Sequence, residues 1–169
     1  MSTLSPAGES VRTRMSRAGR DRAPAVLVDA VLAYEVPEED LPRLLADAWC
    51  GAEHPLRVEE PTVWRVAFSR VGYRTAGGQL ADRPARMVLY RGASRTEATG
   101  RFGWSWTTDL LTAKYFATRH GQEGTAVYRA EVPGAALLAD YRDDDRGEGE
   151  VVVDPDLLDP ATVEIVAIP

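Results

Sequence analysis

The spacing of apolar residues changes near the middle of this chain, and this change constrains the fold more than any other feature of the sequence. Between residues 25 and 75, apolar side chains recur at helical intervals, as in 41–49 and 64–71. Beyond residue 86, the apolar residues instead form short β-rich runs bounded by Gly or Pro, over 87–91, 126–132, 150–154 and 163–168. Helices followed by strands with few long crossovers predict an α+β fold with a mainly antiparallel sheet.

Composition and the positions of Gly and Pro divide the chain into four segments. Residues 1–23 are rich in Ser, Gly, Pro and Arg and lack periodicity, which predicts a flexible basic tail. A helical N-terminal region is expected over 24–75, and a linker loop that contains two glycines and a proline over 76–85. The last segment, 86–169, is expected to form the sheet-containing core.

Start and stop signals refine the positions of the helices. A helix is expected to open at 37–40, with acidic residues in its first turn, and to end at Gly51; Thr62 and Gly72 are expected to cap the next helix at its two ends. In the second half, the sequence predicts a clear helix over 108–119 and a short one over 134–140.

Charge and composition exclude several classes of function. The 169-residue chain has a net charge of −6 although five arginines lie in its first 23 residues, so the remainder is more acidic still. An acidic body lacks the basic face that duplex nucleic acid requires, and we expect no nucleic-acid partner. Cys50 is the single cysteine, which rules out an intrachain disulfide. No apolar run reaches the ~20 residues of a membrane span, so a cytoplasmic location is expected, with export by a route that needs no standard signal left open.

Arg91 ends the apolar run 88–90 and is followed by Gly92. An arginine at the end of a buried strand needs an anionic partner, and its planar fork suits a pyrophosphate. Gly92 would allow such a ligand to approach the backbone closely. The alternative is a structural ion pair with an acidic side chain such as Asp109.

The next motif reads Trp-Ser-Trp-Thr over 104–107. Because side chains alternate across a strand, the two tryptophans share one face, which we expect to pack in the core. Ser105 and Thr107 share the other face, which we expect to line a cleft. The alternative is a half-buried strand with a solvated face, from which a threonine caps the following helix.

Two aromatic residues lie on that following helix. Phe116 fits its apolar stripe, whereas Tyr115 is one residue off the stripe and could stack on a ligand ring. Core packing is the alternative for both residues.

Glu148 and Glu150 lie two residues apart at the start of the apolar run 151–153. If the chain is extended there, both carboxylates point to one face, with their backbone positions roughly 6.5–7 Å apart. Two carboxylates at this spacing can stabilise a developing oxocarbenium ion and orient or deprotonate an attacking group. The alternative is an acidic strand end that keeps a sheet edge soluble.

Other catalytic plans fit the sequence poorly. Neither His54 nor His120 lies in a recognisable metal-pair spacing, and no metal site is expected. The sequence contains no Gly-Xaa-Ser-Xaa-Gly elbow and no phosphate loop. A Ser-His-Asp triad would require His120 by assumption alone.

Taken together, the order Arg91, then Ser105-Trp106-Thr107, then Glu148-Gly149-Glu150 resembles the Arg-Ser-Glu class of ADP-ribosyltransferases, which is related to bacterial mono-ADP-ribosylating toxins. The resemblance covers about residues 86–169. It implies an ADP-ribosyltransferase-like, mainly antiparallel split sheet, here preceded by a helical N-terminal region.

The resemblance also implies roles for individual residues. Arg91 would contact the NAD phosphates, and Ser105 and Thr107 would take the first and third places of the family's Ser-Thr-Ser strand. Glu150 would be the catalytic glutamate that binds the nicotinamide-ribose hydroxyl, and Glu148 would position or activate an acceptor arginine. The loop 141–147 would correspond to the family's substrate-recognition turn, with a plain solvated loop as the alternative. The NAD-binding positions would be Arg91, Gly92, Ser105, Thr107, Tyr115 and Phe116.

The resulting hypothesis is an NAD-dependent mono-ADP-ribosyltransferase that cleaves the nicotinamide glycosidic bond and modifies a protein acceptor on arginine. NAD is its substrate, and the helical N-terminal region would present the domain to a target or a partner. One alternative is an NAD glycohydrolase with water as the acceptor. The other is a non-catalytic binding or regulatory protein on a degenerate transferase scaffold.

Overall fold

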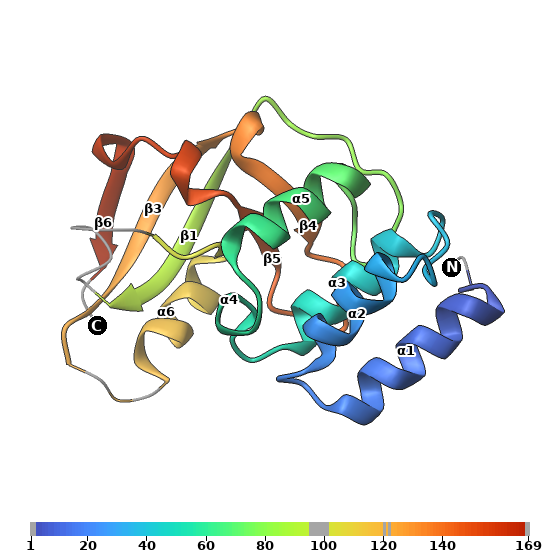
Figure 1. The fold of residues 1–169 in the computed structure, drawn as a ribbon. Coiled ribbons are helices and arrows are strands. Elements are labelled where there is room, and N and C mark those ends of the chain that lie inside the picture. Colours follow the sequence, from blue (N-terminus) through green and yellow to red (C-terminus); the bar gives the residue numbers. More distant parts are fainter. Residues whose placement is uncertain (1–2, 95–101, 120, 122, 168–169) are drawn as a thin grey trace. The chain divides into compact units, whose positions relative to one another are not determined.

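The computed structural model of the chain describes residues 3–94, 102–119, 121 and 123–167; Ile168 and His120, considered above, lie outside this part. The chain divides into two compact units, Met1–Leu80 and Ala81–Pro169 (Figure 1). This boundary falls inside the segment 76–85, where the sequence predicts a linker. The first unit is helical, and the second contains the sheet.

The described part of the first unit contains five helices, and each has a proline in its first two positions. Proline suits this place because its fixed φ fits a helix and its missing N–H would have no intrahelical partner. The helices are α1 (Pro6–Ala18), α2 (Ala23–Leu32), α3 (Leu41–Gly51), α4 (Pro55–Val58) and α5 (Pro61–Val71). Two predicted helix starts are wrong. The first turn of α3 holds no acidic residue, because the helix begins at Leu41, after the turn 38–40. Thr62 lies inside the first turn of α5, which begins at Pro61, and does not cap it.

The aromatic core of the first unit joins α3 and α5. Trp49 of α3 meets Trp64 and Phe68 of α5 edge to face, with ring centroids 4.9 and 5.4 Å apart. All three side chains are buried. Such edge-to-face pairs add ~0.5–1.5 kcal/mol each beyond the burial of their area. These residues belong to the stripes that the helical periodicity of the sequence indicates.

Helix α1 occupies residues 6–18, where the sequence predicted a flexible tail, and this corrects that expectation. Val11 and Met15, four residues apart, are buried on one side of the helix. The start of α1 is fixed by Asp40, a buried carboxylate that accepts hydrogen bonds from the Ser5 N–H at 3.1 Å and the Ser5 hydroxyl at 2.5 Å. The tail therefore folds because a residue far along the chain anchors its N-cap.

The second unit is built on a six-stranded sheet with the order β4-β5-β2-β1-β3-β6. Every strand pair is antiparallel, which confirms the α+β class with a mainly antiparallel sheet. The strands are β1 (Arg86–Ser94), β2 (Ser105–Thr107), β3 (Thr125–Pro133), β4 (Leu137–Tyr141), β5 (Glu150–Val153) and β6 (Val163–Ala167). Short 3₁₀ turns cover Gly134–Ala136, Pro155–Leu157 and Pro160–Thr162.

The sheet has a narrow junction between β1 and β2. Strands β1 and β3 pair along their whole length, from Arg86↔Pro133 to Ser94↔Thr125. Within the described residues, β1 and β2 share one register pair, Tyr90↔Thr107. The sheet therefore consists of two three-stranded groups, β4-β5-β2 and β1-β3-β6, that meet at this pair.

Strand β4 corrects the short helix predicted over 134–140. Residues 134–136 form a single 3₁₀ turn, after which the chain extends. Tyr141 and Asp140 pair with Glu150 and Val151 of β5. A short apolar run is compatible with a helix or a strand, and here pairing with β5 makes residues 137–141 a strand.

One helix, α6 (Leu110–Thr118), follows β2 and packs on β1 and β3, as Figure 1 shows. Ala113 and Ala117 of the helix and Val127 of β3 form the buried contact, with Tyr90 and Leu110 beside them. The helix begins two residues later than the sequence predicts. Among the described residues, no helix has both the length and the apolar character needed to cross a lipid bilayer.

Candidate functional site

The register of the sheet brings the three sequence motifs onto adjacent strands. Thr107 of β2 pairs with Glu150 of β5 on one side and with Tyr90 of β1 on the other. Arg91 follows Tyr90 directly, and Ser105 pairs with Val152 of β5. Residues from three distant parts of the chain thus converge at the junction between the two groups of strands.

The Arg91 guanidinium lies against the backbone that leads into β2. Its Nη1 donates a hydrogen bond to the Ser105 carbonyl at 2.8 Å. Gly103 is also adjacent, since a Cβ added there would lie 2.1 Å from the Arg91 Nη2 atom. Gly103 therefore makes room for the guanidinium, a role that the sequence analysis did not recognise.

Asp109, the alternative partner considered for Arg91, instead caps helix α6. Its carboxylate accepts hydrogen bonds from the N–H groups of Leu111 and Thr112 at 3.1 and 3.0 Å, and from the Thr112 hydroxyl at 2.8 Å. The Thr112 hydroxyl first, and then the two N–H groups, lower the pKa of Asp109 below its ordinary value. Asp109 is thus committed to the helix N-terminus.

Gly92 faces helix α6, which corrects the expectation that it leaves the backbone open to a ligand. A Cβ at this position would lie 1.9 Å from the Ala113 carbonyl oxygen and 2.6 Å from the Ala117 nitrogen. Glycine is needed here because the helix backbone approaches β1 so closely.

The side chains at and just before strand β2 follow the prediction for the tryptophan face but not for the face that carries Thr107. Trp104 and Trp106 are buried, as predicted, and the Trp106 indole N–H donates to the Gly103 carbonyl at 2.9 Å. Ser105 is half-buried. Thr107 is buried rather than open: its hydroxyl donates to the Glu148 carbonyl and accepts from the Asp109 N–H, each at 3.1 Å.

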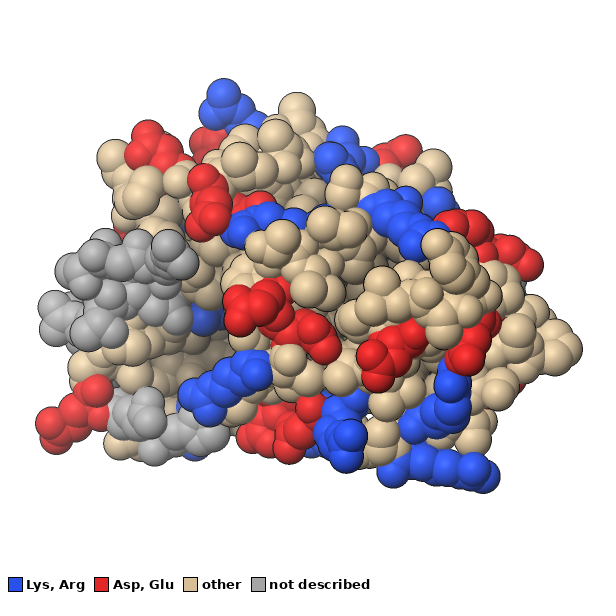
Figure 2. All heavy atoms as spheres, viewed as in Figure 1, with Lys and Arg blue, Asp and Glu red and all other residues tan. Residues whose placement is uncertain are grey.

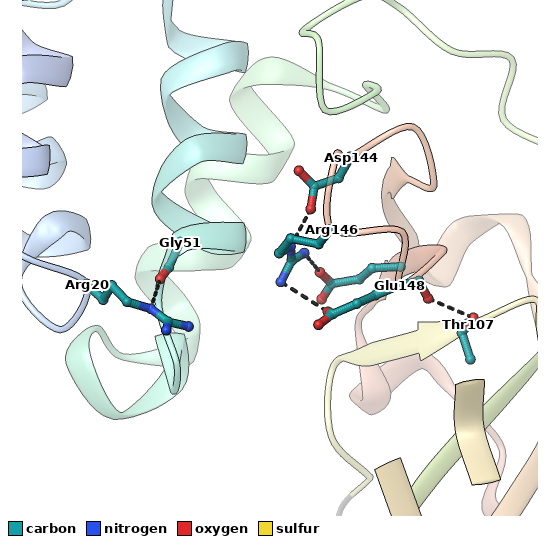
Figure 3. Close-up of polar contacts among 7 residues, drawn as sticks. Arg20, Gly51, Thr107, Asp144, Arg146 and Glu148 are labelled. Atoms are coloured by element: carbon teal, nitrogen blue, oxygen red, sulfur yellow. Dashed lines mark hydrogen bonds and ion pairs between the residues drawn. The ribbon is translucent and has the colours of Figure 1, made fainter. Parts of the chain in front are cut away.

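The carboxylates of Glu148 and Glu150 converge on one guanidinium, that of Arg146. Figure 3 shows Arg146 between Asp144 and Glu148. Arg146 Nη1 lies 3.1 Å from Glu148 Oε2, and Arg146 Nη2 lies 2.6 Å from Glu150 Oε2. The chain is not extended across the pair, because Gly149 adopts a left-handed φ of 60° and β5 begins only at Glu150. The glutamates are therefore brought together by Arg146 rather than by strand alternation.

Arg146 is a residue of this cluster that the sequence analysis missed. It also binds Asp144 through Nε, so its guanidinium contacts three carboxylates, those of Asp144, Glu148 and Glu150. The available signal was its spacing of two and four residues before the glutamates. Arg142, in the same loop, instead binds Asp140 through Nε and Nη2 at 2.7 and 2.6 Å.

Tyr115 and Phe116 lie on α6 and differ in exposure. Tyr115 is exposed, and its ring meets that of Phe116 edge to face, with centroids 5.6 Å apart. Phe116 is half-buried, and the Arg119 guanidinium lies 4.6 Å from its ring centre. Of the two, only Tyr115 presents an open ring, as its position off the apolar stripe predicts.

The surface charges are mixed. Acidic and basic side chains are interspersed over the face drawn in Figure 2. Within the part of the chain that the structure describes, no group of three or more His, Cys, Asp or Glu side chains is arranged to hold a metal ion.

The comparisons with known proteins gave no relative. The chain has no significant match to a model of a protein family, to a curated protein or to a solved structure.

Proposed function

We propose that this protein is an NAD-dependent mono-ADP-ribosyltransferase. The observation that carries the proposal is the glutamate pair, whose carboxylates share one guanidinium at the start of β5, on the strand next to β2. The sheet register supports it further, because Arg91 and Ser105 lie on the neighbouring strands, in the order that the resemblance to the Arg-Ser-Glu class requires.

In the proposed reaction, the bond between C1′ of the nicotinamide ribose and the nicotinamide nitrogen breaks, and nicotinamide leaves with the bonding electron pair. Positive charge develops on the ribose as this bond stretches. The Glu150 carboxylate stabilises that charge, since a fixed carboxylate at a poorly solvated site acts strongly on a developing cation. An acceptor nitrogen then bonds to C1′ and gives up a proton, for which Glu148 is the proposed base.

Arg91 is the proposed ligand of the pyrophosphate. A guanidinium offers two parallel N–H groups that match phosphate oxygens. Its hydrogen bond to the Ser105 carbonyl uses Nη1 at 2.8 Å and orients the fork. Tyr115 is the proposed stacking partner for a ligand ring, because its own ring is exposed.

The test incubates the full chain with NAD labelled in turn on nicotinamide and on adenylate, with a cell lysate as the source of acceptors. Release of nicotinamide together with labelled protein supports the transferase. Release without labelled protein would indicate the glycohydrolase. No NAD binding in calorimetry would indicate the non-catalytic protein and overturn the proposal.

Matched variants assign the chemistry to the glutamates. Glu150→Gln should lower nicotinamide release by ~10²–10³-fold, the usual effect of removing one stabilising group from a transition state. Glu148→Gln should lower protein labelling more than it lowers NAD hydrolysis. Glu164→Gln, an exposed glutamate that pairs with Arg129 at the other end of the sheet, should leave both unchanged.

A further inference from the structure

Arg146 occupies the carboxylates that the proposed reaction needs. Its Nη1 and Nη2 atoms are directed to Glu148 and Glu150, so that one planar fork spans the pair (Figure 3). An acceptor arginine that approached Glu148, its proposed base, would present the same kind of donors as Arg146 does. The resting protein thus already holds a guanidinium beside the carboxylate that the acceptor guanidinium must reach.

We propose that Arg146 is an internal competitor of the acceptor, which displaces its guanidinium from Glu148 and Glu150 before transfer. This inference rests on the proposed function and adds regulation of the same site. An acceptor without a guanidinium cannot replace the fork, so the arrangement also selects acceptors.

The exposed fractions of Glu150 and Arg146 favour replacement of Arg146 by another cation over departure of Arg146 without a replacement. The Glu150 side chain is 8% exposed, and a carboxylate this buried is costly without a cation beside it. The Arg146 side chain is 33% exposed, so solvent partly screens its ion pairs and an incoming cation can reach the cluster. An incoming guanidinium therefore replaces the positive charge that the departing Arg146 takes away from the glutamates.

The local backbone provides the freedom to move. Gly147 and Gly149, which flank Glu148, have φ angles of 66° and 60°. The Glu148 carbonyl stays bound to Thr107, and Glu150 stays in the ladder of β5. Arg146 lies in the turn before these fixed points, so it can leave while the glutamates remain in place.

The first test is made on the unmodified protein without NAD. The Nη–Hη resonance of Arg146, whose Nη1 and Nη2 bind the two glutamates, is followed by NMR during titration with argininamide, a guanidinium compound, and with lysinamide, an ammonium compound. Argininamide should shift this resonance at concentrations where lysinamide has little effect. Arg142 of the same loop is the internal control, because its guanidinium binds Asp140 outside the glutamate pair, and its resonance should not move. An unmoved Arg146 resonance, or equal shifts at both arginines, overturns the inference.

The second test uses argininamide as the acceptor in steady-state kinetics. Arg146→Gln should lower its KM about threefold to fivefold with kcat little changed, the range that loss of a partly exposed ion pair supports. Arg146→Lys, which keeps the charge without the fork, should give an intermediate KM, and Arg142→Gln should match the parent protein. An unchanged or raised KM in Arg146→Gln, which a purely structural role predicts, contradicts the inference.

The two proposals can fail separately. Displacement of Arg146 by argininamide without any release of nicotinamide from NAD refutes the transferase and leaves the guanidinium exchange in place. Transfer to argininamide with an unmoved Arg146 resonance refutes the exchange and leaves the transferase in place.

Discussion

The Thr107 hydroxyl donates a hydrogen bond to the Glu148 carbonyl at 3.1 Å, so strand β2 holds the backbone that carries the glutamate pair. The same hydroxyl accepts from the Asp109 N–H at 3.1 Å. One buried side chain therefore links the start of β5, strand β2 and the cap of helix α6.

We expect Thr107→Val to lower the free energy of unfolding by ~1–3 kcal/mol, because the variant keeps the shape of threonine and removes the hydroxyl that bonds the Glu148 carbonyl and the Asp109 N–H. Urea denaturation measures this loss. Thr107→Ser keeps the hydroxyl and should retain more of the stability than valine does. Equal losses in the two variants would mean that the methyl group, not the hydroxyl, matters here.

Gly92→Ala should displace α6 from β1, because the new Cβ would lie 1.9 Å from the Ala113 carbonyl oxygen. We expect a loss of ~1–3 kcal/mol in the free energy of unfolding, typical of overpacking. Gly51→Ala is the matched control, since a Cβ there meets no atom within 4 Å, and it should change stability by less than ~0.5 kcal/mol. Similar denaturation curves for the two variants would contradict the close approach of helix and strand.

Asp40→Ala should release helix α1, since it removes the acceptor of both Ser5 hydrogen bonds. The expected loss is ~1–3 kcal/mol in the stability of the first unit, with faster amide exchange confined mainly to residues 6–18. Glu39→Gln, an exposed neighbour, is the control. Unchanged protection of α1 in Asp40→Ala would show that its apolar face alone holds the helix.

The cap at Asp109 should make the stability of α6 depend on pH. The folded protein lowers the pKa of Asp109, so its contribution is present above the ordinary value of 3.8 and is lost as pH falls through the folded-state pKa. The difference in stability between the parent protein and Asp109→Ala should therefore be largest near neutral pH and shrink in acid. Denaturation across a pH series measures it, and Asp109→Asn, a cap that does not titrate, should show less of this dependence. A difference that grows in acid would contradict the assignment.

The sequence predicted those parts of the fold that local patterns determine. Helices α3 and α5 follow from their apolar stripes, and the burial of Trp104 and Trp106 follows from alternation along a strand. The α+β class follows from the change of period near the middle of the chain.

Three of the misses share a cause, which is a partner distant in sequence. Helix α1 depends on Asp40, and β4 depends on its pairing with β5. Gly92 was interpreted as a ligand contact because nothing in its neighbourhood indicates that α6 returns to cover it. No local pattern contains this information.

The sequence pointed to the two glutamates of the candidate site but not to the backbone conformation that positions them. Alternation along a strand predicts Glu148 and Glu150 on one face of an extended chain, whereas the chain turns at Gly149. Their carboxylates nevertheless meet, through Arg146. A periodic pattern can indicate that two like charges are close, but it does not reveal the counter-charge between them.

Within the described residues, Tyr90↔Thr107 is the single register pair between β1 and β2, so contacts outside the ladder matter at this junction. Arg91 belongs to one group of strands and Glu150 to the other. The Arg91 guanidinium reaches across to the Ser105 carbonyl of β2, and helix α6 packs on β1, β2 and β3. A side chain and a helix therefore join the two groups of strands where backbone pairing between them is narrowest.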